Sequence, residues 1–241
     1  MLKKIYFLCF LQFVYNNEIR LTIHPRPADE KSSLIWFNKT SYDFWTNQLD
    51  NYLEVYRFSS LTVGRTENLV ECDYHKPPLP GKVCNINPEK LSPCVVTNYF
   101  GYRNSSPCIF LEIDLVDGWK PKYFMDYKTL PESMPNMLRK YIHENAIEPE
   151  MWETVWVSCD GEMPADKEFV GPITYIPGPG IPGYFYPFNG QKGYLNPIIA
   201  IQFETPITGL VINIECTVWA ANIKQNKEQG IGSARFQLLI D

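Results

Sequence analysis

Hydrophobic and polar positions alternate or cluster over most of the second half of the chain in patterns that predict β-strands. Residues 109–115 end in an alternation of apolar and acidic positions, which is typical of a strand with one buried face. Further segments rich in β-branched and aromatic residues are separated by Gly and Pro clusters: residues 155–159, 173–176, 198–203, 210–219 and 234–240. The sequence shows no regular strand–helix alternation and no internal repeat, so the pattern predicts an antiparallel β-sandwich with long excursions.

Helical periodicity occurs in two places. Between residues 41 and 56, apolar residues recur at three- and four-residue steps, at Trp45, Leu49, Tyr52, Leu53 and Tyr56. We interpret this stripe as one face of an amphipathic helix that packs on its own domain. A second short helix is expected over residues 136–143, directly after Pro135.

The chain begins with an apolar segment. Lys3 and Lys4 precede residues 5–15, which are mostly apolar and have the form of a secretory signal sequence or, alternatively, of the remnant of a membrane anchor. Residues 18–33 are polar, contain prolines and lack periodicity, so we interpret them as an extended stalk. The expected division is an N-terminal apolar segment at residues 1–17, a stalk with a short helix at 18–58, and a β-sandwich domain at 59–241.

Composition narrows the class of protein. The 241 residues include 22 Lys and Arg against 27 Asp and Glu, a net charge of −5, which argues against a nucleic-acid partner. Hydrophobic residues make up 45% and charged residues 20% of the chain, enough apolar surface to bury a core. Aromatic residues at 15% and 20 prolines favour a strand-and-loop protein over a helical one.

Cysteines point to an oxidising compartment. Six of the seven lie beyond residue 70 and form no CxxC pair: Cys72, Cys84, Cys94, Cys108, Cys159 and Cys216. We interpret them as three disulfides, whose pairing the spacing alone leaves open. Sequons at Asn38 and Asn104 predict glycosylation and agree with an extracellular or lumenal location. The true immunoglobulin signature fails, because no tryptophan lies between Cys159 and Cys216.

No catalytic constellation emerges from the motifs. His143 and Glu144 begin like a metalloprotease motif, but Ile147 stands where the second ligand belongs. Nucleophile elbows and Walker loops do not occur, and residues 178–183 have two prolines that make a turn the better interpretation than a phosphate loop. We therefore expect no catalytic residue, no cofactor and no metal site. A disulfide-rich secreted hydrolase is disfavoured, because the sequence shows no pair of nucleophile and base that such an enzyme needs.

Residues 184–195 hold five aromatic rings: Tyr184, Phe185, Tyr186, Phe188 and Tyr194. A strand with rings on both faces cannot bury all of them in one core, so some rings are expected to face a partner. The alternative is that loops of the same domain cover both faces.

Several short motifs, in this order along the chain, resemble those of one known family: Lys82–Cys84, Leu91–Cys94, Phe100–Tyr102, Gly118–Pro121, Cys159–Gly161, Gly183–Phe188, Tyr194–Phe203, Ile214–Cys216 and Arg235–Phe236. With the order of the six cysteines, they resemble the β subunits of the Na+/K+-transporting ATPase, in an invertebrate form, from about Leu21 to Asp241. The β subunit of the H+/K+ pump is a close sibling.

The resemblance implies a fold and a covalent framework. It implies a mainly β protein, an immunoglobulin-like antiparallel β-sandwich outside the cell with long disulfide-linked loops and one or two short helices. It also implies that consecutive cysteines pair, as Cys72–Cys84, Cys94–Cys108 and Cys159–Cys216.

The resemblance further implies a non-catalytic subunit. Such a subunit binds the catalytic α subunit, assists its folding, assembly and delivery to the plasma membrane, and modulates the K+ affinity of Na+/K+ transport. It is a single-pass type II membrane protein with an extracellular C-terminal domain, and the spanning helix is expected to be missing or truncated in this chain. Neither a nucleic acid nor a small-molecule substrate is expected as a partner.

Family segments implicated in assembly with α carry over to seven positions: Tyr186, Pro187, Phe188, Gly190, Phe236, Leu238 and Ile240. The alternative function is a secreted or surface glycoprotein that serves as an adhesion or recognition module derived from the same family. Co-purification with an α subunit distinguishes the two.

Overall fold

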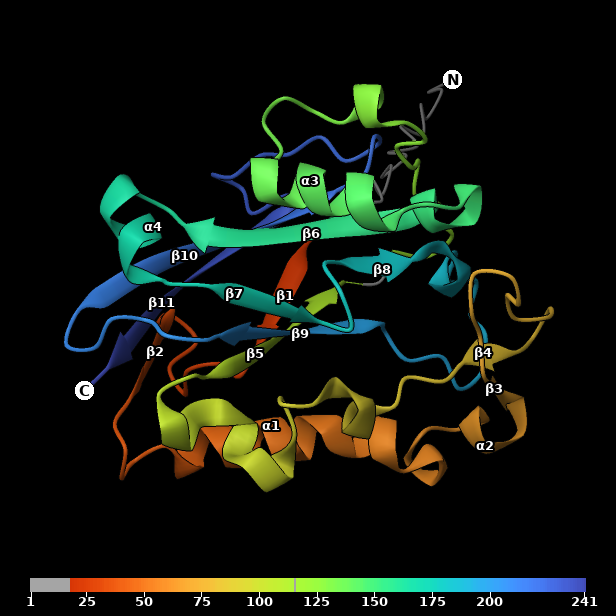
Figure 1. Ribbon diagram of the computed structural model, residues 1–241. Helices are drawn as coiled ribbons and strands as arrows, with labels where there is room; N and C mark the ends of the chain where they lie inside the picture. Colours follow the sequence, from red (N-terminus) through yellow and green to blue (C-terminus); the bar gives the residue numbers. More distant parts are fainter. Residues whose placement is uncertain (1–17, 115) are drawn as a thin grey trace, which may run out of the picture.

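Strands that the hydrophobic pattern predicts pair into two sheets in the computed structural model, which describes residues 18–114 and 116–241 (Figure 1). They are β5 (Cys108–Ile113), β6 (Thr154–Gly161), β7 (Ile173–Ile176), β9 (Ile198–Phe203), β10 (Val211–Trp219) and β11 (Ser233–Ile240). The expected end of the first strand, at residue 115, and the N-terminal apolar segment at residues 1–17 lie outside the described residues.

Five shorter strands complete the sheets: β1 (Leu21–His24), β2 (Leu34–Phe37), β3 (Leu69–Val70), β4 (Val83–Cys84) and β8 (Gly180–Pro182). One sheet has the order β1-β5-β9-β7, the other has the order β2-β11-β10-β6-β8, and β3 pairs with β4. The pairs β2–β11 and β3–β4 are parallel and the others are antiparallel. The predicted mainly β class with antiparallel sheets is confirmed.

Both helices that the periodicity predicts are present, as α1 (Asp43–Arg57) and α3 (Asn136–Asn145). Helices α2 (Arg65–Asn68) and α4 (Pro164–Phe169) are too short for a periodic pattern to reveal. Six 3-10 segments connect the other elements: η1 (Ser59–Leu61), η2 (Pro88–Leu91), η3 (Val96–Asn104), η4 (Tyr127–Thr129), η5 (Pro149–Trp152) and η6 (Gly183–Phe185). Within the described residues, no helix combines the length and the apolar character that a bilayer span requires.

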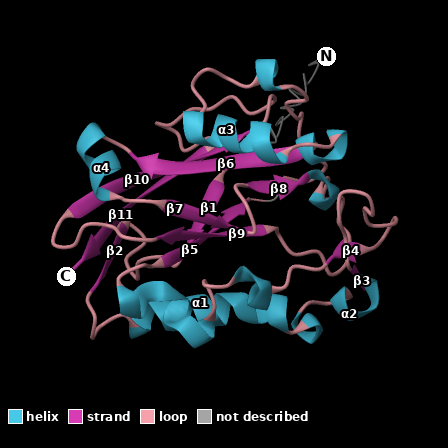
Figure 2. Cartoon of the chain, in the orientation of Figure 1, coloured by secondary structure: helices cyan, strands magenta, loops and turns pink. Residues whose placement is uncertain are grey.

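The two sheets form a sandwich that helices cover on both outer faces (Figures 1 and 2). Inward positions of β10 alternate along the strand, and Ile212, Ile214, Cys216 and Val218 are all inaccessible to solvent. Helix α1 lies on the outer face of the sheet that contains β5, and α3 lies on that of the sheet that contains β6. Each sheet therefore has part of its outer face buried under a helix, whereas the outward side chains of Trp36 and Val211 remain 50% and 45% exposed.

A buried polar network joins α1 to its sheet. The hydroxyl of Tyr52 donates to Glu112 Oε2 at 2.6 Å, Asn196 donates to Glu112 Oε1, and the His24 ring stacks on Tyr52 with centroids 3.8 Å apart. Burial alone would raise the pKa of Glu112, but hydrogen bonds from His24, Tyr52 and Asn196 together lower it. The carboxylate is thus stabilised in its charged form beneath the helix.

Two tryptophans fill the space under α3. Trp156 on β6 and Trp219 on β10 are 5% and 6% exposed, and they pack with Leu138 and Ile142 of α3. The indole N–H of Trp219 donates to Ser158 Oγ at 2.9 Å, which satisfies one buried donor of the layer. A second, smaller apolar cluster therefore lies outside the sandwich core.

Residues 18–33 differ from the expected stalk, because they are part of the sandwich. Strand β1 pairs with β5 in the register Leu21↔Ile113, and β2 pairs with β11. Both strands have four residues, and prolines follow β1 at Pro25 and Pro27, so no alternation long enough to predict a strand is present. The boundary expected after residue 58 does not separate a stalk from the sandwich.

Three disulfides join consecutive cysteines: Cys72–Cys84, Cys94–Cys108 and Cys159–Cys216. This is the order that the family resemblance implies. Cys159 on β6 and Cys216 on β10 face each other across one sheet, with Cα atoms 4.0 Å apart. The bond therefore ties neighbouring strands, whereas the immunoglobulin disulfide ties the two sheets.

Tyr175 closes the open edge of β6. Strand β8 pairs only with the first residues of β6, so the backbone of Cys159 has no strand partner on that side. Instead, the Cys159 N–H donates to the Tyr175 hydroxyl at 2.6 Å, and that hydroxyl donates to Cys159 O at 3.3 Å. Burial raises the pKa of Tyr175 to about 12, so the hydroxyl remains protonated and can serve both bonds.

We predict that Tyr175→Phe destabilises the chain by about 1–3 kcal/mol, because the mostly buried Cys159 N–H loses its acceptor. Urea denaturation of the oxidised chain measures the change. Tyr127→Phe removes the hydroxyl of a more exposed tyrosine and should change stability by less than about 0.5 kcal/mol. Equal stabilities of the two variants would contradict the role of Tyr175.

Candidate functional site

Residues 183–195, here called the aromatic loop, do not form a strand. The loop begins with η6 and continues without regular structure to residue 197, with a cis bond between Tyr186 and Pro187. All five rings are half-buried. The domain's own segments therefore cover much of the ring surface, as the alternative interpretation of the sequence held.

Aromatic contacts fasten the loop to the rest of the domain. Two ring pairs join the loop to other segments, with centroid distances of 5.6 Å for Tyr74–Tyr184 and 5.3 Å for Trp119–Tyr186, and within the loop Phe188–Tyr194 is 5.0 Å. The Trp119–Tyr186 pair is edge-to-face, with an angle of 89° between the rings, a favourable geometry for aromatic pairs. Rings from three separate segments of the chain thus meet in one cluster.

Hydrogen bonds fix the loop at several points along its length. Gly183 N donates to Glu153 O at 2.6 Å, Gly118 N donates to Phe188 O at 2.7 Å, and the Tyr194 hydroxyl donates to Phe185 O at 3.1 Å. These bonds join the loop to the end of η5, to the segment after β5 and to itself. The backbone of the loop is therefore held in one shape, although it lacks regular structure.

Arg65 is the least expected anchor of the loop. This arginine at the start of α2 is inaccessible to solvent, and its Nη1 donates to Gly193 O at 2.9 Å. Nε and Nη2 are also buried and have no hydrogen-bond partner, and burial lowers the pKa of the guanidinium. From the sequence, residues 63–66 are a loop without chemistry. A lone arginine gives no signal of burial.

Glycines allow the loop to lie directly on α2. Gly193 has φ +83°, and a Cβ at this position would lie 2.5 Å from Arg65 N. Gly190 has a similar φ of +72°, but nothing lies within 4 Å of its Cβ position. The close approach of Gly193 to Arg65 therefore requires a residue without a side chain.

The loop has an inner and an outer part. The Tyr186 hydroxyl is buried without a hydrogen-bond partner, and burial raises its pKa well above the usual range, so it points inward. Pro187 and Phe188 are half-buried, whereas Asn189 and Gly190 are exposed. Residues 187–190 are here called the outer rim of the loop.

The C-terminal strand does not share this surface. Phe236, Leu238 and Ile240 are 4%, 1% and 1% exposed and belong to the core between the sheets. Figure 1 also places the end of β11 at the opposite end of the sandwich from η6. Their implied role in assembly stays a prediction, and their inward positions leave them no surface for direct contact with a partner in the folded domain.

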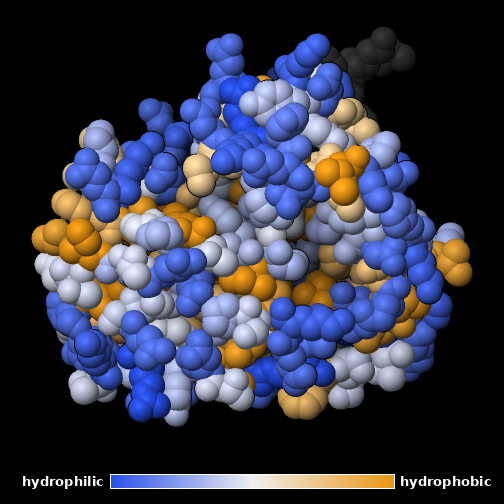
Figure 3. Space-filling view, viewed as in Figure 1, coloured by the Kyte–Doolittle hydropathy of each residue, from blue (hydrophilic) through white to orange (hydrophobic). Residues whose placement is uncertain are grey.

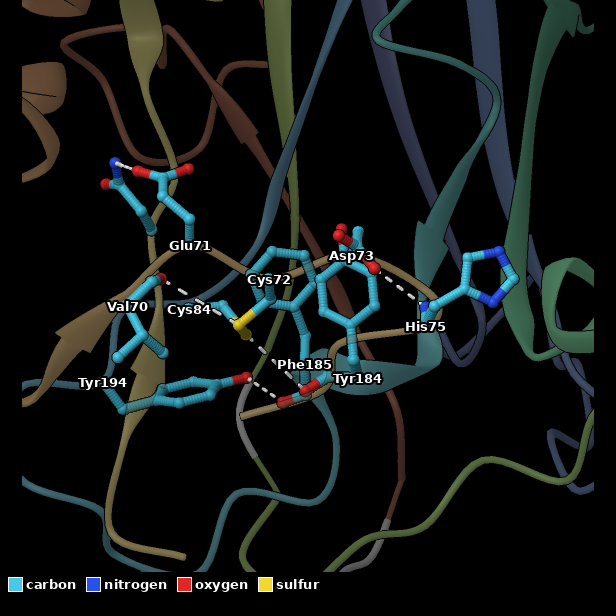
Figure 4. Close-up of a disulfide and its surroundings, with 10 residues drawn as sticks. Val70, Glu71, Cys72, Asp73, His75, Cys84, Tyr184, Phe185 and Tyr194 are labelled. Atoms are coloured by element: carbon cyan, nitrogen blue, oxygen red, sulfur yellow. Dashed lines mark hydrogen bonds between the residues drawn. A yellow bond between two sulfur atoms is a disulfide. The ribbon is translucent and has the colours of Figure 1, made fainter. Parts of the chain in front are cut away.

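The Cys72–Cys84 disulfide lies beside the base of the aromatic loop. Figure 4 shows Tyr184, Phe185 and Tyr194 around the disulfide. Strands β3 and β4 flank the bond, with Val70 paired to Cys84. The disulfide thus holds together the segments on which the loop rests.

The two sequons lie on the surface at different places. Asn104 is exposed at the end of η3, and Asn38 is half-buried in the turn between β2 and α1. The Thr40 hydroxyl donates to Asn38 Oδ1 at 2.9 Å. Neither asparagine belongs to the aromatic loop.

A groove of about 620 Å³ opens between α3 and β7, where Figure 3 shows apolar residues at the surface among hydrophilic ones. Its charged groups are already paired: Lys140 lies 3.8 Å from Glu144, and Asp160 lies 3.3 Å from Lys167. The Tyr175 hydroxyl in its wall serves the backbone of Cys159. These groups therefore supply no free pair for acid–base chemistry.

Only one set of side chains in the described residues brings three potential metal-ligating residues together. It consists of His75, Glu148 and Glu150, whose ligand atoms lie within 4.8 Å of one another. The set lies apart from the outer rim. His143 and Glu144, which the sequence analysis considered, are not part of it.

Comparisons with known proteins identify similar chains. The model of a family described as "Sodium / potassium ATPase beta chain" matches residues 16–237. The Drosophila melanogaster sodium/potassium-transporting ATPase subunit beta-2 is 44% identical over 220 residues, which cover 89% of this chain and 68% of that protein. The beta-1 subunit of the same organism is 36% identical over 217 residues, 88% and 67% of the two chains. The Homo sapiens subunit beta-2 is 24% identical over 216 residues, 83% and 64%.

Paired glycine substitutions test the anchoring of the loop. Gly190→Ala should cost about 1 kcal/mol, because only its positive φ is unfavourable for alanine. Gly193→Ala should cost roughly 3 kcal/mol, because overlap with the Arg65 backbone is added to the same φ penalty. Urea denaturation gives both values, and limited proteolysis reports whether the loop has detached. A cost for Gly193→Ala no larger than that for Gly190→Ala would disprove the contact.

Proposed function

Because the chain belongs to the sodium/potassium ATPase β-chain family, whose members are non-catalytic subunits of the ATPase complex, we propose that it assembles with a catalytic α subunit. The chain spans about two thirds of the length of the two Drosophila relatives, at 68% and 67%. The observation that carries the proposal is the match over residues 16–237, which includes both sheets and the aromatic loop.

The outer rim is the surface proposed for contact with α. Its residues lie on a loop that aromatic contacts, backbone hydrogen bonds and Arg65 hold in one shape. A loop that is already ordered loses little conformational entropy on binding, which favours association. Tyr186 is proposed to act from behind this surface, because its ring packs on Trp119 and its hydroxyl is buried.

Phe236, Leu238 and Ile240 are proposed to act through the fold. These side chains fill the core between the sheets, next to the strand β10 and opposite β9. Substitutions there reduce the amount of folded subunit that is available for assembly. Their effect on complex formation should therefore follow their effect on stability.

The biological role follows from assembly. In this proposal, the subunit assists the folding of α and its delivery to the plasma membrane, and it modulates the K+ affinity of Na+/K+ transport. The three disulfides support an extracellular position for the described domain, because such bonds persist in oxidising compartments. The proposed topology is type II, with the C-terminal domain outside the cell.

Co-expression with a sodium-pump α subunit tests the contact surface. Phe188→Ala and Pro187→Ala should reduce co-precipitation with α from mild detergent by at least about fivefold, the effect of losing roughly 1 kcal/mol at an interface. Phe44→Ala, at a ring that is 49% exposed on α1, should leave co-precipitation unchanged. Protease resistance of each variant expressed without α serves as the folding control.

Two results would contradict this surface. One is normal co-precipitation of both rim variants. The other is an equal loss in protease resistance and in co-precipitation, which would assign Pro187 and Phe188 to folding alone.

Glycosylation provides an independent test of topology. After expression in animal cells, glycosidase treatment should change the electrophoretic mobility of Asn104→Gln by one glycan less than that of the wild type. The same result is expected for Asn38→Gln. Asn98→Gln, an asparagine outside any sequon, should migrate as the wild type does. A wild-type chain that reaches the cell surface without any glycan would contradict the proposed sites.

A further inference from the structure

Three side chains from two distant segments meet where the Cys72–Cys84 loop contacts η5. His75 comes from a turn in that loop, and Glu148 and Glu150 come from the start of η5. One ligand atom of each residue lies within 4.8 Å of the other two, and His75 Nε2 is 3.0 Å from Glu148 Oε2. Imidazole nitrogen and carboxylate oxygen are common ligands of divalent transition metals.

The turn that carries His75 is held in place by its own bonds. The backbone N–H of His75 donates to Asp73 Oδ1 at 2.8 Å, and Figure 4 shows the imidazole pointing away from the disulfide. The Tyr74 hydroxyl bonds to Thr154 Oγ1 at 2.9 Å, and Thr154 Oγ1 donates to Met151 O of η5 at 2.8 Å. This chain of hydrogen bonds keeps His75 next to the two glutamates.

Among the described residues, neither carboxylate pairs with a lysine or arginine, and the ionisable neighbour of Glu148 is the His75 imidazole. Glu148 Oε2 is shielded from solvent and accepts no hydrogen bond, although the imidazole lies beside it. Glu150 forms no ion pair with a lysine or arginine among residues 18–114 and 116–241. Two negative groups so close together repel each other, and a cation between them would remove that repulsion.

We propose that His75, Glu148 and Glu150 bind a first-row divalent transition metal ion of the zinc(II) type. An imidazole ligand favours such an ion over calcium or magnesium, which prefer oxygen ligands alone. Zinc–ligand bonds of about 2.1 Å place tetrahedral ligand atoms about 3.4 Å apart. The His75 and Glu148 side chains are 65% and 43% exposed, so they are free to rotate over this small distance, and water supplies the fourth ligand.

The ion would join two parts of the domain that support the aromatic loop. Tyr74, the neighbour of His75, packs against Tyr184 of the loop, and Gly183 N donates to Glu153 O, just after η5. A metal between His75 and the glutamates therefore links both supports. Because it binds the folded chain, it also raises the stability of the chain in proportion to its concentration.

Titration of the purified, metal-free full chain with Zn²⁺ alone tests the proposal. Equilibrium dialysis at neutral pH should show one saturable Zn²⁺ per chain, and the melting temperature should rise with added Zn²⁺. Ca²⁺ and Mg²⁺ should produce neither effect. Co²⁺ should give an absorption spectrum in the visible range that Zn²⁺ abolishes by competition.

Variants assign the ligands. His75→Ala, Glu148→Gln and Glu150→Gln should each weaken Zn²⁺ binding by more than about tenfold. A tenfold loss is typical when only a residue that hydrogen-bonds to a metal ligand is removed. His143→Ala and Glu144→Gln are matched controls at another exposed site and should bind as the wild type does. Without metal, all five variants should keep the wild-type melting temperature, which verifies folding.

Three outcomes would overturn the proposal: wild-type binding in all three ligand variants, binding of Ca²⁺ equal to that of Zn²⁺, or no saturable Zn²⁺ binding below millimolar concentration. The first outcome would place the ion elsewhere on the surface. The second would show that the imidazole is not a ligand, and the third would show that the cluster is an ordinary group of surface charges.

Discussion

The constraint on which the structure depends is that a helix covers part of the outer face of each sheet. An antiparallel sandwich can leave its outer faces to water, with polar residues alternating along each strand. Here part of the outer face of one sheet is buried under α1, and part of that of the other is buried under α3. Side chains that would be solvated in an ordinary sandwich, such as Trp156, Ser158 and Glu112, must therefore find partners inside the protein.

This constraint explains where the polar groups of the fold are buried. Glu112 under α1 accepts hydrogen bonds from Tyr52 and Asn196 and has His24 Nε2 3.6 Å away, which favours its charged form, and Trp219 under α3 donates to Ser158. Where no strand or helix completes a sheet, a single side chain does so, as Tyr175 does for the backbone of Cys159. The helical covers occupy the two broad faces, so surfaces for partners and ions are left to the loops at the ends of the sandwich.

How much could be read from the sequence depended on the length of each element and on its composition, since the four-residue β7 (Ile173–Ile176) is rich in β-branched and aromatic residues and was predicted. The strands β6, β9, β10 and β11 are long enough for composition and periodicity to reveal, and α1 shows its stripe over four turns. Strands β1 and β2 have four residues each, and their pairing with distant strands is a tertiary effect that no local pattern records. Residues 18–33 therefore resembled a stalk.

The candidate site shows the same limit in a different form. Its aromatic residues were visible as a cluster in the sequence, but their enclosure by Tyr74, Trp119 and Arg65 depends on segments up to 128 residues away. A buried arginine and an imidazole beside two glutamates are invisible to motif searches, because their members are common surface residues and their spacing has no pattern. Pairing of the cysteines likewise came from the family resemblance and not from their spacing.

The separation of the outer rim from β11 changes how assembly defects should be understood. A residue in the core and a residue on a contact surface can both abolish a complex when they are substituted, but they act on different equilibria. Loss of Leu238 lowers the fraction of folded subunit, and its effect on the complex disappears when the comparison is made per folded molecule. If Phe188 contacts α as proposed, its loss lowers the affinity of the folded subunit itself, and the deficit persists after that correction. Only the second kind of residue defines an interface, and under the proposed function that kind lies on the aromatic loop.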